Sequence, residues 1–529
     1  MRGAVAAGHP LTAAAGARAL AEGGNAVDAC VAAAFASWVT ESPLTGPGAG
    51  GFMLVHRARD ASTRLLDFFV ATPGLGLKRS RGGEMESIDV GFGGDSETKQ
   101  VFRIGPASCA VPGAAAGLEV AHRAYGSLPW PELVAPAVEL ARDGIELTRP
   151  QAHLHAILDL ILRHTPEGKR MYGKGGTRLV AGDRLRLPDL ANTLERLARD
   201  GARALYRGEV ARAMVATVRE GGGGLTLEDL ASYRVVWRRP VRTRFHAYEF
   251  VSNPPPSSGG ILIAYGLSLL ERLGGAEAGS AEAIATLVEV MREQTRARDG
   301  AFARDLHRGG LARRLLARGT VDAALKRLRA DAAGRTELAS VGGTTHVSAV
   351  DADGNAASLS SSTGSGSGCI VHDTGIHLNN MLGEYDLIVG KPAPPGRRMT
   401  SMMAPSVVLD QRGSPRLVVG SAGSVRLRGA IMQIVVNVLE HGLGVAEAID
   451  APRLHVDEPH VHCEGGFDAR ELDRLEADGY DVVRWRRRNL FFGGAAAVEV
   501  RPDGELAAAG DARRGGAGSV VALDGSIGA

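Results

Sequence analysis

Apolar and polar positions follow a helical period through much of the first two thirds of the chain. Residues 11–21 are rich in Ala and are followed by Gly-Gly-Asn, which is a typical helix stop. Residues 26–39 are apolar on nearly every side, so they predict a deeply buried helix. The same period predicts further helices that include residues 137–142, 191–199 and 281–298.

Strand-like alternation predicts one hairpin early in the chain and several strands after Gly342. The early hairpin pairs residues 52–56 with 64–69. The late one is THVSAVDADGNAASLSS, which alternates on both sides of an Asp-Gly-Asn turn. Residues 399–409 and 416–419 predict further strands, and a buried helix between Ile431 and Leu439 follows them.

Two segments break these periods. Residues 78–100 are polar, Gly-rich and aperiodic, which predicts an exposed loop. The run PPPSSGG at residues 254–260 predicts a rigid turn that is neither helix nor central strand. The chain as a whole reads as helical first and strand-rich later, without an internal repeat.

Composition and charge exclude several classes of protein. The 529 residues are 44% apolar and 23% charged, as expected for a globular chain that can build one large layered domain. Lys plus Arg is 61 and Asp plus Glu is 59, so no basic excess points to a nucleic-acid partner. The longest apolar stretch, residues 29–39, is too short to span a bilayer, so we expect no membrane contact.

The cysteines and the N-terminus indicate a compartment. Four cysteines lie far apart without a CxxC pair, which favours buried free thiols in a reducing environment. Arg2, His9 and Arg18 interrupt the first residues where a secretory leader needs an unbroken apolar run. From the chain as it stands we expect a cytoplasmic protein.

Three motifs fail the test of their context. Residues 46–51 satisfy GxGxxG, but a helix precedes them and a strand follows, the reverse of a dinucleotide site. Residues 351–355 begin like a calcium loop, yet its sixth and twelfth positions hold Ala356 and Ser362. His455, His460 and His462 lack any metal-binding spacing. The sequence therefore predicts no cofactor and no metal.

The segment that carries chemistry is Val-Gly-Gly-Thr-Thr-His-Val-Ser, residues 341–348, where helical character gives way to strand. A loop entering a strand is one interpretation, since Thr is common there. The other is a self-cleavage site with Thr344 as nucleophile. A Thr at a new N-terminus carries its own base, because a free α-amine has a pKa of about 8. Gly343 tolerates the strained backbone that such a cut requires.

The chain resembles the γ-glutamyltransferase family of N-terminal nucleophile hydrolases over nearly its whole length. GGNAVDACVAAAFA, AVPGAAAGLEVAHRAYGSLPW, LYRGEV, LTLEDLASYR and PPPSSGGI resemble the family's large subunit, in its order. GGTTHVSAVDADGNAASLS, GIHLNNMLGEYD, MTSMMAPSVVL and GSAGSVRLRGAIMQIVVNVLEHGLGVAEAIDAPRLH resemble its small subunit.

The resemblance implies an α+β fold, a four-layer αββα sandwich, made as a single self-cleaving precursor or zymogen. The cut would fall between Gly343 and Thr344, giving a large fragment, residues 1–343, and a small fragment, residues 344–529. The fragments would stay together as a heterodimer in one αββα domain, which could assemble further. The substrate would be a small-molecule amide or acyl compound.

The resemblance also assigns roles to individual residues. Thr344 would attack a carbonyl, form an acyl-enzyme and pass the acyl group to water or an amine. Ser362 would orient Thr344, and the backbone N–H groups of Gly423 and Ser424 would form the oxyanion hole, where each donor contributes about 3 kcal/mol. The positions that would hold a glutamyl group are Asn380, Glu384, Thr400 and Ser401, with Glu384 suited to an α-ammonium.

Departures from the family pattern concern the substrate. Phe69 stands where γ-glutamyl enzymes place an Arg that grips the α-carboxylate. Met381 and Gly364 replace residues that are often polar there. The expected activity is a γ-glutamyl hydrolase or transferase, as in glutathione metabolism. The alternative is the same mechanism on another substrate, as an amide acylase or as a C–C hydrolase that removes an oxalyl-type group in antibiotic biosynthesis.

Two further alternatives stay open on sequence grounds. One is an unprocessed relative that serves as a binding protein without catalysis. The other is a serine hydrolase that uses one of Ser360 to Ser362, although no GxSxG motif supports it.

Overall fold

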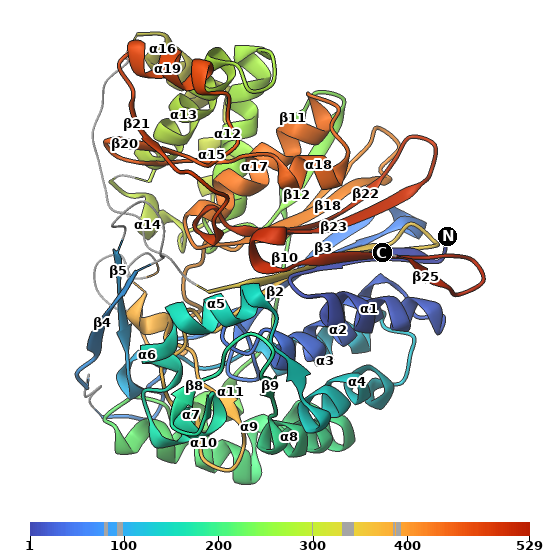
Figure 1. Ribbon diagram of the computed structural model, residues 1–529, viewed down its shortest axis with the longest axis vertical. Coiled ribbons are helices and arrows are strands. Elements are labelled where there is room, and N and C mark those ends of the chain that lie inside the picture. Colours follow the sequence, from blue (N-terminus) through green and yellow to red (C-terminus); the bar gives the residue numbers. More distant parts are fainter. Residues whose placement is uncertain are drawn as a thin grey trace.

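Two stacked β-sheets form the centre of the molecule, and helices cover their outer faces (Figure 1). The structure is a computed structural model that describes residues 1–78, 83–91, 99–298, 300–330, 343–384, 387 and 393–528. The larger sheet has eight strands in the order β10 (Val236–Arg238), β3 (Ser62–Phe68), β2 (Gly50–Arg57), β14 (Ala356–Ser362), β13 (Thr345–Asp351), β1 (Gly3–Ala7), β24 (Ala517–Val521) and β25 (Ile527–Gly528). The smaller has six, in the order β11 (Val241–Phe245), β12 (Tyr248–Ser252), β17 (Ser406–Leu409), β18 (Pro415–Ala422), β22 (Gly494–Val500) and β23 (Leu506–Gly510).

The inner faces of the two sheets pack on each other through β13 and β14 of the larger sheet and β18 and β22 of the smaller. The larger sheet is covered first by α1 (Pro10–Ala21), α2 (Ala26–Thr40) and α3 (Ala114–Tyr125). The smaller is covered by α12 (Gly259–Leu273), α17 (Arg426–Leu439) and α18 (Val445–Asp450). The order helix, sheet, sheet, helix confirms the expected αββα sandwich.

Additional helices thicken both outer layers (Figure 1). Below the larger sheet lie α4 (Trp130–Asp143), α5 (Arg149–Ile157), α6 (Asp159–Leu162), α7 (Pro166–Met171), α8 (Pro188–Asp200), α9 (Arg203–Tyr206), α10 (Gly208–Glu220) and α11 (Leu227–Ser232). On the side of the smaller sheet lie α13 (Ala281–Arg296), α14 (Phe302–Asp305), α15 (Leu311–Leu315), α16 (Arg318–Ala330) and α19 (Ala469–Ala477). The predicted helices around residues 137–142, 191–199 and 281–298 are confirmed by α4, α8 and α13.

Minor strands complete the described chain in small sheets. These are β4 (Glu86–Gly91) with β5 (Lys99–Ile104), β6 (Ile145–Glu146) with β9 (Arg184–Leu185), β7 (Gly173–Lys174) with β8 (Thr177–Arg178), β15 (Ile370–Val371) with β16 (Ile376–His377), and the trio β19 (Leu454–Asp457), β20 (His460–Cys463) and β21 (Asp481–Arg484).

Helix α2 is buried along its whole length, as its sequence predicts. The side chain of Asn25 accepts hydrogen bonds from the N–H groups of Val27 and Asp28, and the Asp28 carboxylate accepts one from Asn25 N–H. This capping box fixes the helix start. Its many alanines let α2 pack closely between α1, α4 and the larger sheet. The helix therefore gives a rigid support beneath β13, and it ends at Glu41.

Both sheets combine strands from the two sides of the predicted cut. In the larger sheet β1, β2, β3 and β10 precede Gly343, and β13, β14, β24 and β25 follow it. In the smaller sheet β11 and β12 precede the cut, and β12 pairs with β17 from the second part of the chain. Neither part could form its sheets alone, because the backbone hydrogen bonds of each sheet cross between them.

Three local expectations need correction. Part of the expected loop at residues 78–100 forms the antiparallel hairpin β4–β5, in which Ile88 and Phe102 are cross-strand partners and both are buried; residues 79–82 and 92–98 lie outside the described part. The turn at residues 254–260 ends sooner than expected, since Gly259 and Gly260 begin α12. Of residues 399–409, only Ser406–Leu409 form a strand.

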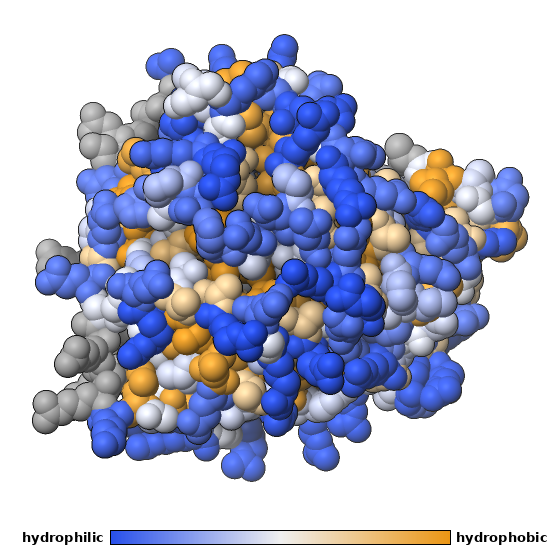
Figure 2. Space-filling model, turned by 90° about the horizontal axis from the view of Figure 1, so that it is seen from below, coloured by the Kyte–Doolittle hydropathy of each residue, from blue (hydrophilic) through white to orange (hydrophobic). Residues whose placement is uncertain are grey.

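Among the described residues, no helix is both long and apolar enough to cross a membrane. The face seen from below, on the side of α7, α8 and α10, is mainly hydrophilic, with apolar groups scattered between charged ones (Figure 2). The four cysteines are buried and free, as predicted.

Candidate active site

Thr344 lies at the end of a central strand, directly before β13. Strand β13 pairs with β1 on one side and with β14 on the other, and its first registered pair with β14, Thr345 with Ser361, directly follows Thr344. Only 5% of the surface of Thr344 is exposed. The predicted nucleophile thus directly precedes a central strand of the larger sheet.

Ser362 contacts the carbonyl group of the predicted cleavage site. Its hydroxyl donates a hydrogen bond to the Gly343 carbonyl oxygen and accepts one from the Gly364 N–H at 2.8 Å. The contact in the uncut chain is therefore with the carbonyl that Thr344 would attack. The predicted role of Ser362 in orienting Thr344 stays a prediction.

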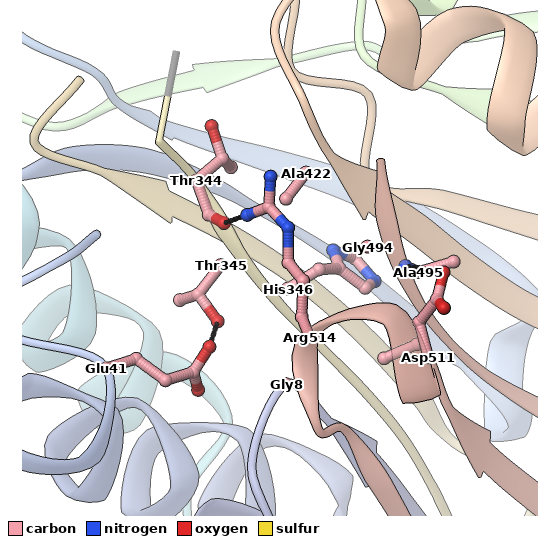
Figure 3. A pocket seen from close by; sticks show the side chains of 11 residues that line it. Gly8, Glu41, Thr344, Thr345, His346, Ala422, Gly494, Ala495, Asp511 and Arg514 are labelled. Carbon is pink, nitrogen blue, oxygen red and sulfur yellow. Dashed lines mark hydrogen bonds between the residues drawn. The ribbon is translucent and has the colours of Figure 1, made fainter. Parts of the chain in front are cut away.

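A small cavity lies at the start of β13 (Figure 3). Thr344, Thr345 and His346 line it together with Glu41 and Arg514. The Arg514 guanidinium donates to the Thr344 carbonyl oxygen at 3.2 Å, and the Thr345 hydroxyl donates to a Glu41 carboxylate oxygen at 2.5 Å. Residues 344 and 345 are thus each hydrogen-bonded to an ionisable side chain.

Sequence reasoning missed both charged residues. Glu41 caps the C-terminus of α2 and Arg514 ends a short 3-10 helix, Ala512–Arg514, so they lie 473 positions apart. In the sequence, Glu41 closely follows the apolar run at residues 29–39. The signal available in the sequence was an acidic residue shortly after a helix predicted to be buried. A buried carboxylate must either be hydrogen-bonded or paired, or become protonated.

Burial sets the protonation of the groups in this cavity. It raises the pKa of Glu41 to about 7, although the hydrogen bonds from Thr345 and Thr12 and the charge of Arg514 each lower that pKa. It lowers the pKa of His346 to about 3, so that imidazole is neutral. His346 bonds Ser360 at 2.8 Å and Ser348 at 3.0 Å between the two sheets. Ser360 is fully buried there. The serine-hydrolase alternative, which also includes Ser361 and Ser362, stays a prediction.

The predicted oxyanion loop directly follows Ala422, which lines the same cavity as Thr344. Strand β18 ends at Ala422, and α17 starts at Arg426. Between them Gly423 has φ 121° and Ser424 has φ 53°. Such positive φ values turn the backbone sharply, and a non-Gly residue adopts them at a cost that functional sites often bear. The stacking of the two sheets thus brings the end of β18 to the cavity that Thr344 lines, and the role of the loop stays a prediction.

Asn380 and Glu384 lie together beside Gly364. The Asn380 side chain accepts from Ser365 N–H at 2.9 Å and donates to the Ser365 hydroxyl at 2.7 Å. A Cβ at Gly364, where φ is 73°, would overlap the Asn380 amide and come within 3.0 Å of a Glu384 carboxylate oxygen. Gly364 is therefore required by the packing. Asn380 fixes the loop that follows Ser362, while Glu384 is 5% exposed.

Thr400 and Ser401 are occupied with their own chain. The Thr400 hydroxyl donates to the Leu387 carbonyl oxygen at 2.5 Å. The Ser401 hydroxyl accepts from Met403 N–H at 3.0 Å, and the Ser401 carbonyl oxygen accepts from Ser258 N–H at 2.7 Å. These contacts hold the segment before β17 against the start of α12. A direct role of either residue in substrate binding stays a prediction.

Phe69 and Met381, which replace polar residues of the family pattern, lie in one apolar cluster. The Phe69 ring stacks on Phe52, with ring centroids 5.4 Å apart, and is fully buried. Met381, Met399 and Met403 belong to the same cluster. No exposed edge of Phe69 is left to bind a charged group.

A cation does lie beside Phe69, but it binds the protein itself. The Arg398 guanidinium donates to the Phe69 carbonyl oxygen, to the Tyr233 hydroxyl at 2.7 Å and to the Arg234 carbonyl oxygen at 2.7 Å. It also pairs with the buried carboxylate of Asp67 at 3.1 Å. Arg398 is thus committed to four partners and is no substitute for an arginine that would project from position 69.

Within the described ranges, no group of three or more His, Cys, Asp or Glu side chains could hold a metal ion. His455 and His462 are buried in β19 and β20, and His460 pairs with Asp481 at 2.9 Å. The turn at Asp351 closes the β13–β14 hairpin, as the sequence predicts.

A strand-borne threonine, a sheet sandwich and a hydroxyl on the preceding carbonyl define the arrangement of an N-terminal nucleophile hydrolase precursor. The family model described as gamma-glutamyltranspeptidase matches residues 12–521, and the chain belongs to this family. The resemblance seen in the sequence is confirmed.

Two relatives of this chain are named for different activities, one as a glutathione hydrolase and one as an acylase. The chain is 32% identical to the glutathione hydrolase proenzyme of Escherichia coli strain K12 over 93% of this chain and 87% of the relative. It is also 32% identical to the acylase ACY 1 proenzyme of Pseudomonas sp. strain SE83, over 99% of this chain and 94% of the relative. The family consists of hydrolases and acyltransferases, so the chain is an enzyme rather than a binding protein.

Solved structures share the fold. Cephalosporin acylase from Bacillus halodurans superposes with a TM-score of 0.82 at 24% identity, over 98% of this chain and 95% of that protein. The gamma-glutamyltranspeptidase of Helicobacter pylori covers 60% of this chain with a TM-score of 0.52 at 29% identity.

Proposed function

We propose that the enzyme is a self-cleaving amide acylase that uses Thr344 and prefers an acyl group other than γ-glutamyl. The observation that carries the substrate preference is the burial of Phe69 and Met381 in an apolar cluster, where a glutamyl-reading enzyme needs a cation. A buried aromatic ring offers nothing to an α-carboxylate, and burying that carboxylate without a partner is costly.

Maturation begins with the attack of the Thr344 hydroxyl on the Gly343 carbonyl carbon. The Ser362 hydroxyl donates to the oxygen of that carbonyl and stabilises the negative charge that develops on it. Transfer of the acyl group from nitrogen to oxygen gives an ester, and water hydrolyses the ester. The products are the two fragments and a free α-amine on Thr344.

Turnover repeats the same attack on a substrate amide. The α-amine takes the proton of the Thr344 hydroxyl, the hydroxyl oxygen attacks the amide carbonyl, and the leaving amine takes up a proton. The N–H groups of Gly423 and Ser424 stabilise the oxyanion. Water or an amine then takes the acyl group from the acyl-enzyme. The fragments stay associated as a heterodimer, because the hydrogen bonds of each sheet cross between them.

A second candidate is the γ-glutamyl reaction itself. It is favoured by Glu384, a buried carboxylate beside Gly364 and Asn380, which could receive the α-ammonium of a glutamyl group. The identity to a glutathione hydrolase supports it equally. The two candidates differ in the acyl group and share every catalytic step.

A matched pair of chromogenic amides separates them. γ-Glutamyl-p-nitroanilide and butyryl-p-nitroanilide have acyl chains of the same length, and the second lacks both the α-ammonium and the α-carboxylate. We expect a higher kcat/KM for the butyryl compound, by about tenfold or more, because the glutamyl charges are desolvated without an arginine. Thr344→Ala is the control for background hydrolysis.

A higher kcat/KM for the γ-glutamyl compound would reverse the assignment. Glu384→Gln then tells how the charge is read, because only the γ-glutamyl reaction should lose activity in that variant. Release of p-nitroaniline by uncut protein or by Thr344→Ala would contradict the mechanism as a whole.

A further inference from the structure

Glu41 occupies an unusual position for a carboxylate. It lies at the C-terminal end of the fully buried helix α2, where the helix dipole disfavours a negative charge. Only 7% of it is exposed. One carboxylate oxygen accepts the Thr345 hydroxyl at 2.5 Å and the other accepts the Thr12 hydroxyl at 3.3 Å. Gly8 makes room for it, because any side chain there would overlap the carboxylate.

Glu41 also lines two cavities. Gly8, Glu41 and Arg514 line both the small cavity at Thr344 and a second small one. Figure 3 shows the Glu41 carboxylate turned to Thr345 and the Arg514 guanidinium turned to the Thr344 carbonyl oxygen. The Thr344 carbonyl oxygen therefore bonds the Arg514 guanidinium, and the side chain of the next residue, Thr345, bonds the Glu41 carboxylate.

We propose that Glu41 is a positioning residue of the mature enzyme, which holds the new N-terminus through Thr345 and presents a negative charge to the Thr344 amine. The inference rests on the proposed cut and adds a residue that the cut itself does not require. Two separate effects follow, one from the hydrogen bond and one from the charge.

The charge acts on the base of the reaction. An ionised carboxylate stabilises a nearby ammonium group and raises the pKa of that ammonium. The ammonium in turn lowers the pKa of Glu41, which burial raises to about 7 in the uncut chain. The cation of Arg514 opposes the effect on the amine. The other charged groups of the two cavities are Asp511 and Arg513, which pair with each other at 3.1 Å. The histidines of these walls, His346 and His155, are buried and have pKa values lowered by that burial, so they stay neutral.

Two variants separate the effects. Glu41→Gln keeps an oxygen that can accept the Thr345 hydroxyl but removes the charge. Thr345→Val keeps the charge but removes the hydrogen bond. The matched control is Glu293→Gln. Glu293 is a buried glutamate on α13 that pairs with Arg296 and Arg327 and lines neither cavity. Each variant is assayed for self-cleavage on a denaturing gel and for kcat/KM from pH 5 to 9.

In Glu41→Gln we expect the acid limb of kcat/KM to move to lower pH by about one unit, because the amine loses its proton more easily. In Thr345→Val we expect that limb to stay in place while self-cleavage and kcat fall about tenfold, the loss of one hydrogen bond. Glu293→Gln should leave both the limb and the cleavage rate as in the wild type.

The inference is overturned if Glu41→Gln is cut and its acid limb coincides with that of the wild type. It is also overturned if Glu41→Gln stays uncut while Thr345→Val matures at the wild-type rate, because Glu41 would then not act through Thr345. Folded but uncut Glu41→Gln together with slow Thr345→Val supports the positioning role. A wild type that stays in one piece refutes the proposed function instead, so the two failures are distinct.

Discussion

Two regions of the molecule differ in character: the surroundings of the residue 343–344 bond and the apolar cluster around Phe69. Around the bond, polar groups converge although they are buried: Ser362 on the Gly343 carbonyl, Arg514 on the Thr344 carbonyl, and Glu41 on Thr345. In the cluster, where the resemblance implies a substrate-binding arginine, Phe69 stacks on Phe52 among methionines.

The difference separates what the reaction needs from what the substrate needs. Buried polar groups are retained only where hydrogen bonds compensate their desolvation, as they do around Thr344. An apolar cluster needs no such partners and can change with the acyl group. We infer that the catalytic chemistry of the family is conserved here, while its recognition of a glutamyl group is not.

The largest effect is expected from Thr344→Ala, which removes the nucleophile. The chain should stay as one band of 55.1 kDa on a denaturing gel, and turnover should fall by roughly 10⁴-fold or more. Thr344→Ser is the matched control, since it keeps a hydroxyl and should still be cut. Two bands from Thr344→Ala would place the nucleophile elsewhere.

Phe69→Arg tests whether the apolar cluster around residue 69 can still accommodate a guanidinium that binds a glutamyl carboxylate. A guanidinium forced into the apolar cluster would be an unpaired buried charge, which costs about 3–5 kcal/mol of unfolding free energy. Phe69→Leu should cost about 1–3 kcal/mol. Thermal unfolding of both variants gives the ranking. A Phe69→Arg protein that is as stable as the wild type and gains γ-glutamyl turnover would show a pocket prepared for glutamate.

Ser362→Ala probes the surroundings of the residue 343–344 bond. Loss of the donor to the Gly343 carbonyl should slow self-cleavage by about 10²-fold, the usual effect of one oxyanion donor. A time course of freshly made protein on a denaturing gel measures it. Ser362→Thr keeps the hydroxyl and should mature at a rate near that of the wild type. Equal rates for the Ala variant would assign the Ser362 contact to packing alone.

The smallest effect is a pH dependence of stability in the uncut chain. The pKa of Glu41 is raised to about 7 in the fold, above its ordinary value of 4.5, so its protonated form is favoured there. Its contribution is therefore complete below pH 4.5 and is lost as pH rises through 7. The melting temperature of Thr344→Ala should fall by a few degrees between pH 5 and 8. The double variant with Glu41→Gln should show a flatter profile, and identical profiles would contradict the assignment.

Much of the fold followed from local pattern. The buried helix α2 and the β13–β14 hairpin have periods and turn residues that leave little choice. The hairpin β4–β5 was missed, because its buried faces hold only scattered apolar residues in a polar, Gly-rich context. Thr344 was predicted as nucleophile from a short run of Gly and Thr residues and from the resemblance to the family. Glu41 and Arg514 were not, since they meet only when the end of α2 and the segment before β24 pack against β13.

The sequence by itself determined many helices and strands through periodicity, and Thr344 as candidate nucleophile through residue type and motif. The αββα sandwich and the absence of an arginine at position 69 were implied by the resemblance to the family. The tertiary structure alone decided what surrounds them. It placed Arg398 on the Phe69 backbone, turned Asn380 onto Ser365, and put a carboxylate and a guanidinium beside residue 344. Such contacts join residues tens to hundreds of positions apart, and no local pattern encodes them, because they depend on how the two sheets and their helices pack.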